Sequence, residues 1–231
     1  MCFSAGRMLN IRMKTGDSVS IENIRLLMRY GVPAARENIS YKVSQLVVTV
    51  LLSSLGSYVL AAKIYAMNIM LFAVLIPNSI GIATGIIVGY LFGEKEYKVL
   101  YWKCYRNIGI GIAAVIVLDF FLIILSGPIL SFFTHDRVII EIAKDIIWME
   151  AFTLKFKAGN FMFSNSLKGP VDVYYSMALS IVSMWVFGVG AAYVMGVVFD
   201  WGIIGIYAGF CMDEAVRCIV MWKRWRKICR R

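Results

Sequence analysis

The chain has 231 residues, of which 60% are hydrophobic, and its mean hydropathy is +0.75. Soluble domains are closer to half apolar, so the composition predicts a polytopic membrane protein. The formal net charge is +10, but the basic residues lie in short segments between apolar stretches. That distribution is typical of membrane topology, and we expect the lipid bilayer as a partner and no nucleic acid. With His135 as the single histidine and no CxxC pair among five cysteines, we expect no metal site.

Residues 1–30 precede the first apolar stretch and are predicted to be a cytoplasmic lead-in without the apolar core of a cleaved signal peptide. Ile21, Ile24, Leu27 and Met28 recur there at helical spacing. This pattern predicts an amphipathic helix lying in the membrane interface, and a solvated lead-in is an equally good interpretation.

Residues 31–222 are predicted to form an all-α unit of six transmembrane helices, because apolar stretches of about 20 residues are long enough to cross a bilayer. The predicted spans are 36–57, 60–92, 103–126, 139–164, 172–198 and 202–222. Residues 223–231 are predicted to be a basic cytoplasmic tail.

The basic residues predict the orientation. They precede the first span, follow the second and fourth spans, and fill the tail, whereas the opposite connections carry little beyond Arg137 and Lys144. By the positive-inside rule, both termini are expected in the cytoplasm of a multi-pass protein of the cell membrane.

The second span carries a ridge of small residues. Gly81, Gly85, Gly89 and Gly93 recur every fourth residue, and Pro77 precedes them. Glycines at this spacing allow a neighbouring helix to approach closely in a bilayer, and proline kinks a helix. We therefore predict a closely packed helix that bends at a hinge.

Polar side chains form one stripe along the first span and another along the fourth. The stripe of the first span is Asn38, Lys42, Gln45, Thr49 and Ser53. The stripe of the fourth span is Glu150, Thr153, Lys157, Asn160 and Ser164. Polar groups inside a membrane must face protein or water, so these residues are predicted to line a solvated cavity. The other interpretation is that they only satisfy one another inside a packed bundle.

Neither an enzyme motif nor a nucleophile beside a base is present, so catalysis is not expected. Asp213 and Arg217 stand four residues apart in the sixth span, and we interpret them mainly as an ion pair at its cytoplasmic end.

Several phrases in a fixed order resemble the C-terminal six-helix lobe of the MATE family, the multidrug and toxic compound extrusion transporters. They are GVPAAREN (31–38), LAAKIYAMNI (60–69), IPNSIGIATGIIVGYLFGEKEY (76–97), NSLKGPVD (165–172), IVSMWVFGVG (181–190) and GIIGIYAGFCMDEAVRC (202–218). The resemblance implies an exporter of organic compounds that exchanges Na⁺ or H⁺ by alternating access, with no other cofactor.

The resemblance also implies a carboxylate that binds the coupling cation. The position where some branches carry it in the first helix of this lobe holds Tyr41 or Lys42 here. Glu150 is therefore the first candidate, with Asp145 second and Glu37 third.

The family has two lobes where this chain resembles one. A second six-helix lobe is therefore expected, from another chain or from a second copy in a homodimer. The alternatives are a truncated remnant without transport and a lipid-linked-sugar flippase of the same superfamily, for which Lys42, Lys155 and Lys157 would supply a basic cavity.

Overall fold

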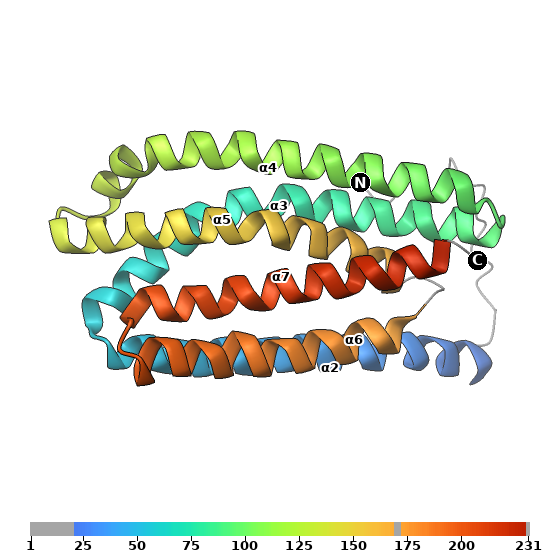
Figure 1. Ribbon diagram of the computed structural model, residues 1–231, viewed down its shortest axis with the longest axis horizontal. Helices are drawn as coiled ribbons and strands as arrows, with labels where there is room; N and C mark the ends of the chain where they lie inside the picture. Colours follow the sequence, from blue (N-terminus) through green and yellow to red (C-terminus); the bar gives the residue numbers. More distant parts are fainter. Residues whose placement is uncertain (1–20, 169–171, 230–231) are drawn as a thin grey trace, which may run out of the picture.

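The computed structural model describes residues 21–168 and 172–229, and these form six antiparallel helical rods (Figure 1). The rods are α2 (Ile21–Ser54), α3 (Ser57–Gly93), α4 (Tyr97–Phe133), α5 (Arg137–Lys168), α6 (Val173–Ser183) with its π-helical continuations η1 (Met184–Ala191) and η2 (Val194–Val198), and α7 (Gly202–Cys229). The described residues contain no strand. The all-α fold with six spans is confirmed.

Short connections make consecutive rods antiparallel neighbours. Leu55 and Gly56 join α2 to α3, and the amide of Gly56 donates to the carbonyl of Ser53 at 3.2 Å. Gly56 has a φ of 120°, a conformation that glycine adopts without the steric cost of a Cβ. Asp200, between η2 and α7, has a φ of 57°, and aspartate is one of the few other residues that tolerate this region.

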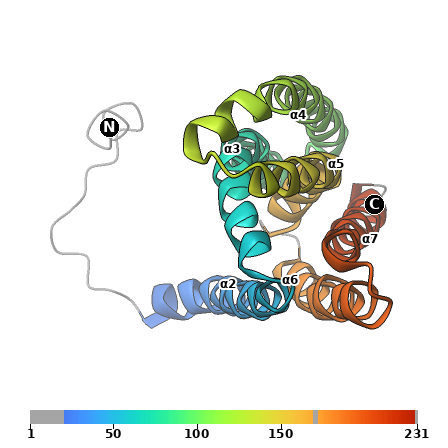
Figure 2. The ribbon, with the colours of Figure 1, turned by 90° about the vertical axis from the view of Figure 1, so that its left-hand side faces the viewer.

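Helix α5 is the centre of the bundle and packs against α3, α4 and α7. Helix α2 lies beside α6 and η1, and the first part of α3 runs from α2 toward α4 and α5 (Figure 2). The buried apolar side chains join α3, α4 and α5, with Leu130, Ile147 and Leu154 among the least exposed. Polar side chains of α5 contact α2 and α7 as well as α4: Lys168 pairs with Glu37, Asn160 donates to Glu214, and Lys155 pairs with Asp119.

The start of α2 and the end of α7 lie at the same end of the bundle (Figure 1). The connection from α3 to α4 lies at this end too, and the α2–α3, α4–α5 and η2–α7 connections lie at the other. The six helical rods therefore run in alternating directions, as the distribution of basic residues predicted. The cytoplasmic location of this end stays a prediction.

Within the described ranges, three helices are both long and apolar enough to cross a membrane: α3, α4 and Val173–Val198, with mean hydropathies of 2.1, 2.9 and 2.0. The 37 residues of α3 extend about 55 Å, more than the roughly 30 Å of a hydrocarbon core. Helices α2, α5 and α7 carry more charged residues, some of which border the interior described below, whereas others, such as Arg25 and Lys42, are exposed.

The two ends of the chain differ from the predicted boundaries. Helix α2 begins at Ile21 and continues without a break past residue 30, so the last ten residues of the predicted lead-in share a helix with the first span. Helix α7 likewise continues to Cys229 through most of the predicted tail. Residues 1–20 lie outside the described residues, and an interfacial position for 21–30 stays a prediction.

Two glycines of the ridge face α5. A Cβ at Gly81 would lie 3.1 Å from the carbonyl oxygen of Phe161, and one at Gly85 would lie 2.9 Å from that of Asn165. Gly93 has open space around it, and Gly89 is half-buried. Pro77 is buried within an uninterrupted α3. Small residues at 81 and 85 thus allow the two backbones to approach, whereas a moving hinge stays a prediction.

Candidate functional site

Two adjoining cavities lie inside the ring formed by α2, α3, α5, η1 and α7. The larger has a volume of about 490 Å³ and the smaller about 50 Å³. They share the following lining residues: Tyr41, Met67, Met70, Glu150, Lys157, Met184, Glu214 and Arg217. The wall from α3 is largely apolar, with Leu71, Val74 and Ile82, whereas the walls from α5 and α7 carry charge. The site is therefore amphipathic, and the larger cavity is open on the side where Leu71 and Ile82 are exposed.

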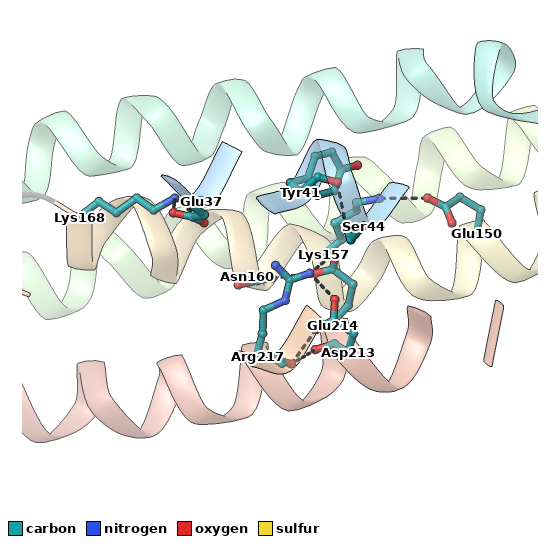
Figure 3. Close-up of polar contacts among 11 residues, drawn as sticks. Glu37, Tyr41, Ser44, Glu150, Lys157, Asn160, Lys168, Asp213, Glu214 and Arg217 are labelled. Atoms are coloured by element: carbon teal, nitrogen blue, oxygen red, sulfur yellow. Dashed lines mark hydrogen bonds and ion pairs between the residues drawn. The ribbon is translucent and has the colours of Figure 1, made fainter. Parts of the chain in front are cut away.

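The Glu150–Lys157 ion pair forms the centre of this site. Lys157 Nζ lies 3.0 Å from Glu150 Oε1, and both side chains are largely buried. The residues are seven positions apart on α5, about 10 Å along the helix axis. The Lys157 side chain runs along the helix to reach the carboxylate (Figure 3). Both charges border both cavities, where water or a ligand can reach them.

A second charged group comes from α7. Arg217 donates to Asp213 at 2.6 Å and to Glu214 at 3.0 Å, and all three side chains are buried or nearly so. The hydroxyl of Ser183, the residue before the π-helical segment, donates to Asp213 at 2.6 Å. From α5, the amide of Asn160 donates to Glu214 at 2.7 Å. Asp213 and Glu214 are thus fixed by α6 and α5 as well as by their own arginine (Figure 3).

Two further basic side chains border the cavities. Lys168, at the end of α5, lies 2.8 Å from Glu37 on α2 and closes one side of the larger cavity. Lys63 on α3 is only 7% exposed, borders the smaller cavity, and donates to the hydroxyl of Thr49 at 2.9 Å. These two contacts join α2 to its neighbours on both sides.

Most members of the two predicted polar stripes border the cavities. Those that do are Asn38, Gln45, Glu150, Thr153, Lys157, Asn160 and Ser164, together with Glu37. Thr49 borders neither cavity but holds Lys63, which does. Every residue of the predicted α5 stripe therefore borders one of the two cavities.

Three predicted residues lie elsewhere. Lys42, Ser53 and Asp145 are exposed and border neither cavity. On α2, the inward face is rotated by about one residue from the predicted stripe, so that Tyr41 occupies the place expected for Lys42. The hydroxyl of Ser53 bonds to the carbonyl of Val50 at 2.8 Å, and such back-bonding lets a serine face lipid without a polar neighbour.

The group on α7 was not recognised from sequence as part of the site. The spacing of Asp213 and Arg217 fits a surface ion pair and a buried one equally well. Lys63 was missed because it stands alone in an apolar segment. The available signal was a cationic side chain within an apolar transmembrane helix, because such residues face a cavity or a partner.

The fold and the site together define a six-helix bundle with apolar helices of membrane-spanning length and charged cavities. The chain belongs to the MatE family, whose profile matches residues 33–194. It is 32% identical to the uncharacterized transporter YisQ of Bacillus subtilis strain 168 over 89% of this chain and 45% of that protein. It is 28% identical to the multidrug resistance protein NorM of Vibrio vulnificus over 80% of this chain and 41% of that protein.

Solved structures show the same fold. An outward-facing multidrug resistance MATE transporter of the MOP superfamily superposes with a TM-score of 0.87 at 19% identity, over 99% of this chain and 52% of that chain. A MOP superfamily transporter from Pyrococcus furiosus, described as having a binding pocket of reverse polarity, gives 0.85 at 20% identity, over 99% and 53%. The chain thus spans about half the length of the proteins it matches, and these are transporters, not enzymes.

Proposed function

We propose that this chain is the C-terminal lobe of a multidrug exporter that moves organic compounds out of the cell by alternating access in exchange for Na⁺ or H⁺. The observation that carries the proposal is the amphipathic cavity of about 490 Å³, with charged side chains in the interior of a membrane bundle. Its volume falls within the roughly 300–1,000 Å³ of small-molecule sites. The apolar wall of α3 suits the body of an organic compound, and the charged wall of α5 and α7 suits its polar groups.

Within this proposal, Glu150 is the coupling carboxylate. It is buried, it borders both cavities, and its partner Lys157 comes from the same helix. Asp145 is exposed on α5 and borders neither cavity. Glu37 borders the larger cavity but is paired with Lys168 at the end of α5. Intramembrane carboxylates that face a cavity commonly mark ion pathways.

A second lobe completes the pathway in this proposal, because the matched transporters are about twice as long as this chain. The second lobe is another chain or a second copy of this one in a homodimer. Lobes that are parallel repeats share one orientation in the membrane, so two copies inserted the same way have the required geometry. In this proposal, the start of α2 and the end of α7 lie on the cytoplasmic side of the plasma membrane.

Efflux of fluorescent organic cations from proteoliposomes under an imposed Na⁺ or H⁺ gradient tests the function. Glu150→Gln is expected to reduce gradient-driven efflux at least about tenfold, because the neutral amide cannot take up a proton and lacks the negative charge that attracts a cation. Glu141→Gln, on an exposed turn of the same helix, is the matched control and is expected to transport normally. Asp145→Asn decides between the two candidate carboxylates. Efflux that survives Glu150→Gln would remove Glu150 from the mechanism.

The flippase alternative is less well supported by the cavity. Of the three lysines that suggested it, Lys157 borders the cavities, Lys42 is exposed, and Lys155 pairs with Asp119 of α4 at 3.2 Å. Scrambling of a lipid-linked oligosaccharide in the same proteoliposomes would favour a flippase. The absence of both activities, alone and with a co-expressed second lobe, would favour a transport-incompetent chain.

A further inference from the structure

Every carboxylate that borders the two cavities is already paired with a basic side chain of this chain. Glu37 pairs with Lys168, Glu150 with Lys157, and both Asp213 and Glu214 pair with Arg217. With Lys63, the two cavities are bordered by four acidic and four basic side chains. The charge at this site is therefore balanced without any bound ion.

The oxygen atoms that a metal cation would need are nevertheless present. Glu150, Asn160 and Glu214 all border the larger cavity. Among the described residues, Oδ1 of Asn160 is buried and has no hydrogen-bond partner. Hard cations favour such carboxylate and amide oxygens. The cations that contact these carboxylates are instead basic side chains of the same chain. The ammonium of Lys157 lies 3.0 Å from Glu150, and the guanidinium of Arg217 lies 3.0 Å from Glu214.

We propose that Lys157 and Arg217 act as built-in counter-cations, so that the site excludes Na⁺ and its coupling ion is H⁺. A sodium ion at Glu150 would meet the ammonium of Lys157 at close range, and like charges in a poorly screened interior repel strongly. A proton meets no such obstacle. It binds to a carboxylate oxygen of Glu150 and neutralises it, and the Lys157 ammonium loses its partner. The site then carries one additional positive charge.

Other charged and titratable groups face Glu150 from the neighbouring helices. They are Tyr41 of α2, Lys63 of α3, and Tyr207, Asp213, Glu214 and Arg217 of α7. Asp213 and Glu214 share one arginine, whereas Glu150 has a lysine that can move away on its long flexible side chain. On α7, two carboxylates share one cation, so that group can also take up a proton. The Glu150→Gln variant tests whether the pair on α5 is the one that a proton opens.

The naming of the coupling ion rests on the proposed function, but the ion preference of the site is measurable without transport. The experiment uses the full chain in detergent and follows thermal unfolding by tryptophan fluorescence. Sodium replaces choline at constant ionic strength, and pH is varied separately. The wild type is expected to show the same melting temperature in Na⁺ and choline, and a melting temperature that changes with pH. Glu150→Gln is expected to lose most of that pH dependence.

Lys157→Met supplies the sharper comparison, because it removes the built-in cation and retains a long side chain. We expect Na⁺ to raise its melting temperature by about 2 °C or more, since a ligand that binds only the folded state stabilises it. Lys155→Met is the matched control: it removes another ion-paired lysine two residues away, whose partner Asp119 belongs to α4 and borders neither cavity. It is expected to lower stability without any response to Na⁺.

A wild type whose melting temperature rises in Na⁺ would overturn the proposal. A Lys157→Met variant whose melting temperature does not respond to Na⁺ would overturn it too. If Lys157→Met does not fold, Lys157→Gln serves the same purpose, and Lys157→Arg, which keeps the charge, is expected to stay insensitive to Na⁺. A chain that shows these responses but transports nothing would leave the ion preference standing and contradict the proposed function alone.

Discussion

At the scale of single residues, the stability of the site depends on whether each buried carboxylate has a basic partner. Arg217 serves two carboxylates, Asp213 and Glu214, in an interior where its side chain is 12% exposed. Removing one partner of a buried pair leaves an uncompensated charge, which is more costly than the pair itself is favourable. Arg217 is thus expected to contribute far more to folding than an ordinary helical ion pair.

Arg217→Ala is expected to lower the free energy of unfolding by about 3–5 kcal/mol, because two buried carboxylates lose their cation. Unfolding in sodium dodecyl sulfate measures the loss. Arg224→Ala is the control, since Arg224 pairs with Asp172 where the arginine side chain is 36% exposed. A loss of at most about 1 kcal/mol is expected there. Equal losses for the two variants would show that Arg217 lies in a well-solvated position.

At the scale of helices, the contact of α3 with α5 depends on glycine at two positions. The backbone oxygen of Asn165 would lie 2.9 Å from a Cβ at Gly85, and a backbone atom within a helix has little freedom to move aside. The packing of the π-helical continuation on α7 is similar, because a Cβ at Gly209 would lie 2.6 Å from the amide nitrogen of Ala192, the residue after η1. Close approach on both sides of the cavity keeps its walls in place.

Gly85→Ala is expected to destabilise the protein by about 1–3 kcal/mol, the usual cost of an overpacked contact, despite the better helix propensity of alanine. Gly109→Ala on α4, where nothing lies within 4 Å of the new Cβ, is expected to be neutral or stabilising. Detergent unfolding of the two variants compares them directly. A neutral Gly85→Ala would mean that α3 and α5 separate easily at this point.

The polar pattern along each helix decided how much of the site could be predicted from the sequence. The stripe of α5 was found because its charged members, Glu150 and Lys157, are conspicuous in a hydrophobic helix and recur at helical spacing. The inward face of α2 was misjudged by about one residue because serine and threonine satisfy their hydroxyls on their own helix, as Ser53 does, and so do not report which side faces a cavity. The burial of Asp213 depends on contacts with Ser183 and α6, which spacing along α7 does not encode.

At the scale of the whole molecule, the short connections, the alternating directions of the rods and the distribution of basic residues agree. One end of the bundle carries the start of α2, the α3–α4 connection and the end of α7. The other end carries the α4–α5 connection with His135. The positive-inside rule predicts that the first end lies in the cytoplasm, and under the proposed function this orientation decides the direction of export.

Two single-cysteine variants in a cysteine-free background test the orientation. Lys98 and His135 are both exposed and lie at opposite ends of the bundle. A membrane-impermeant maleimide applied to intact cells is expected to label His135→Cys at once and Lys98→Cys only after the membrane is permeabilised. The reverse labelling pattern would mean that the start of α2 and the end of α7 lie outside the cell.

The ion pairs also have a consequence for how the protein enters the membrane. Glu150 and Lys157 belong to one helix, and so do Asp213, Glu214 and Arg217. Each charged group can therefore be partly neutralised within its own segment as that segment leaves the insertion machinery, before any neighbouring helix arrives. A cavity whose charges were paired only between helices would expose unpaired ions to lipid during assembly. In this lobe, the pairing that shapes the finished cavity also lowers the barrier to inserting α5 and α7.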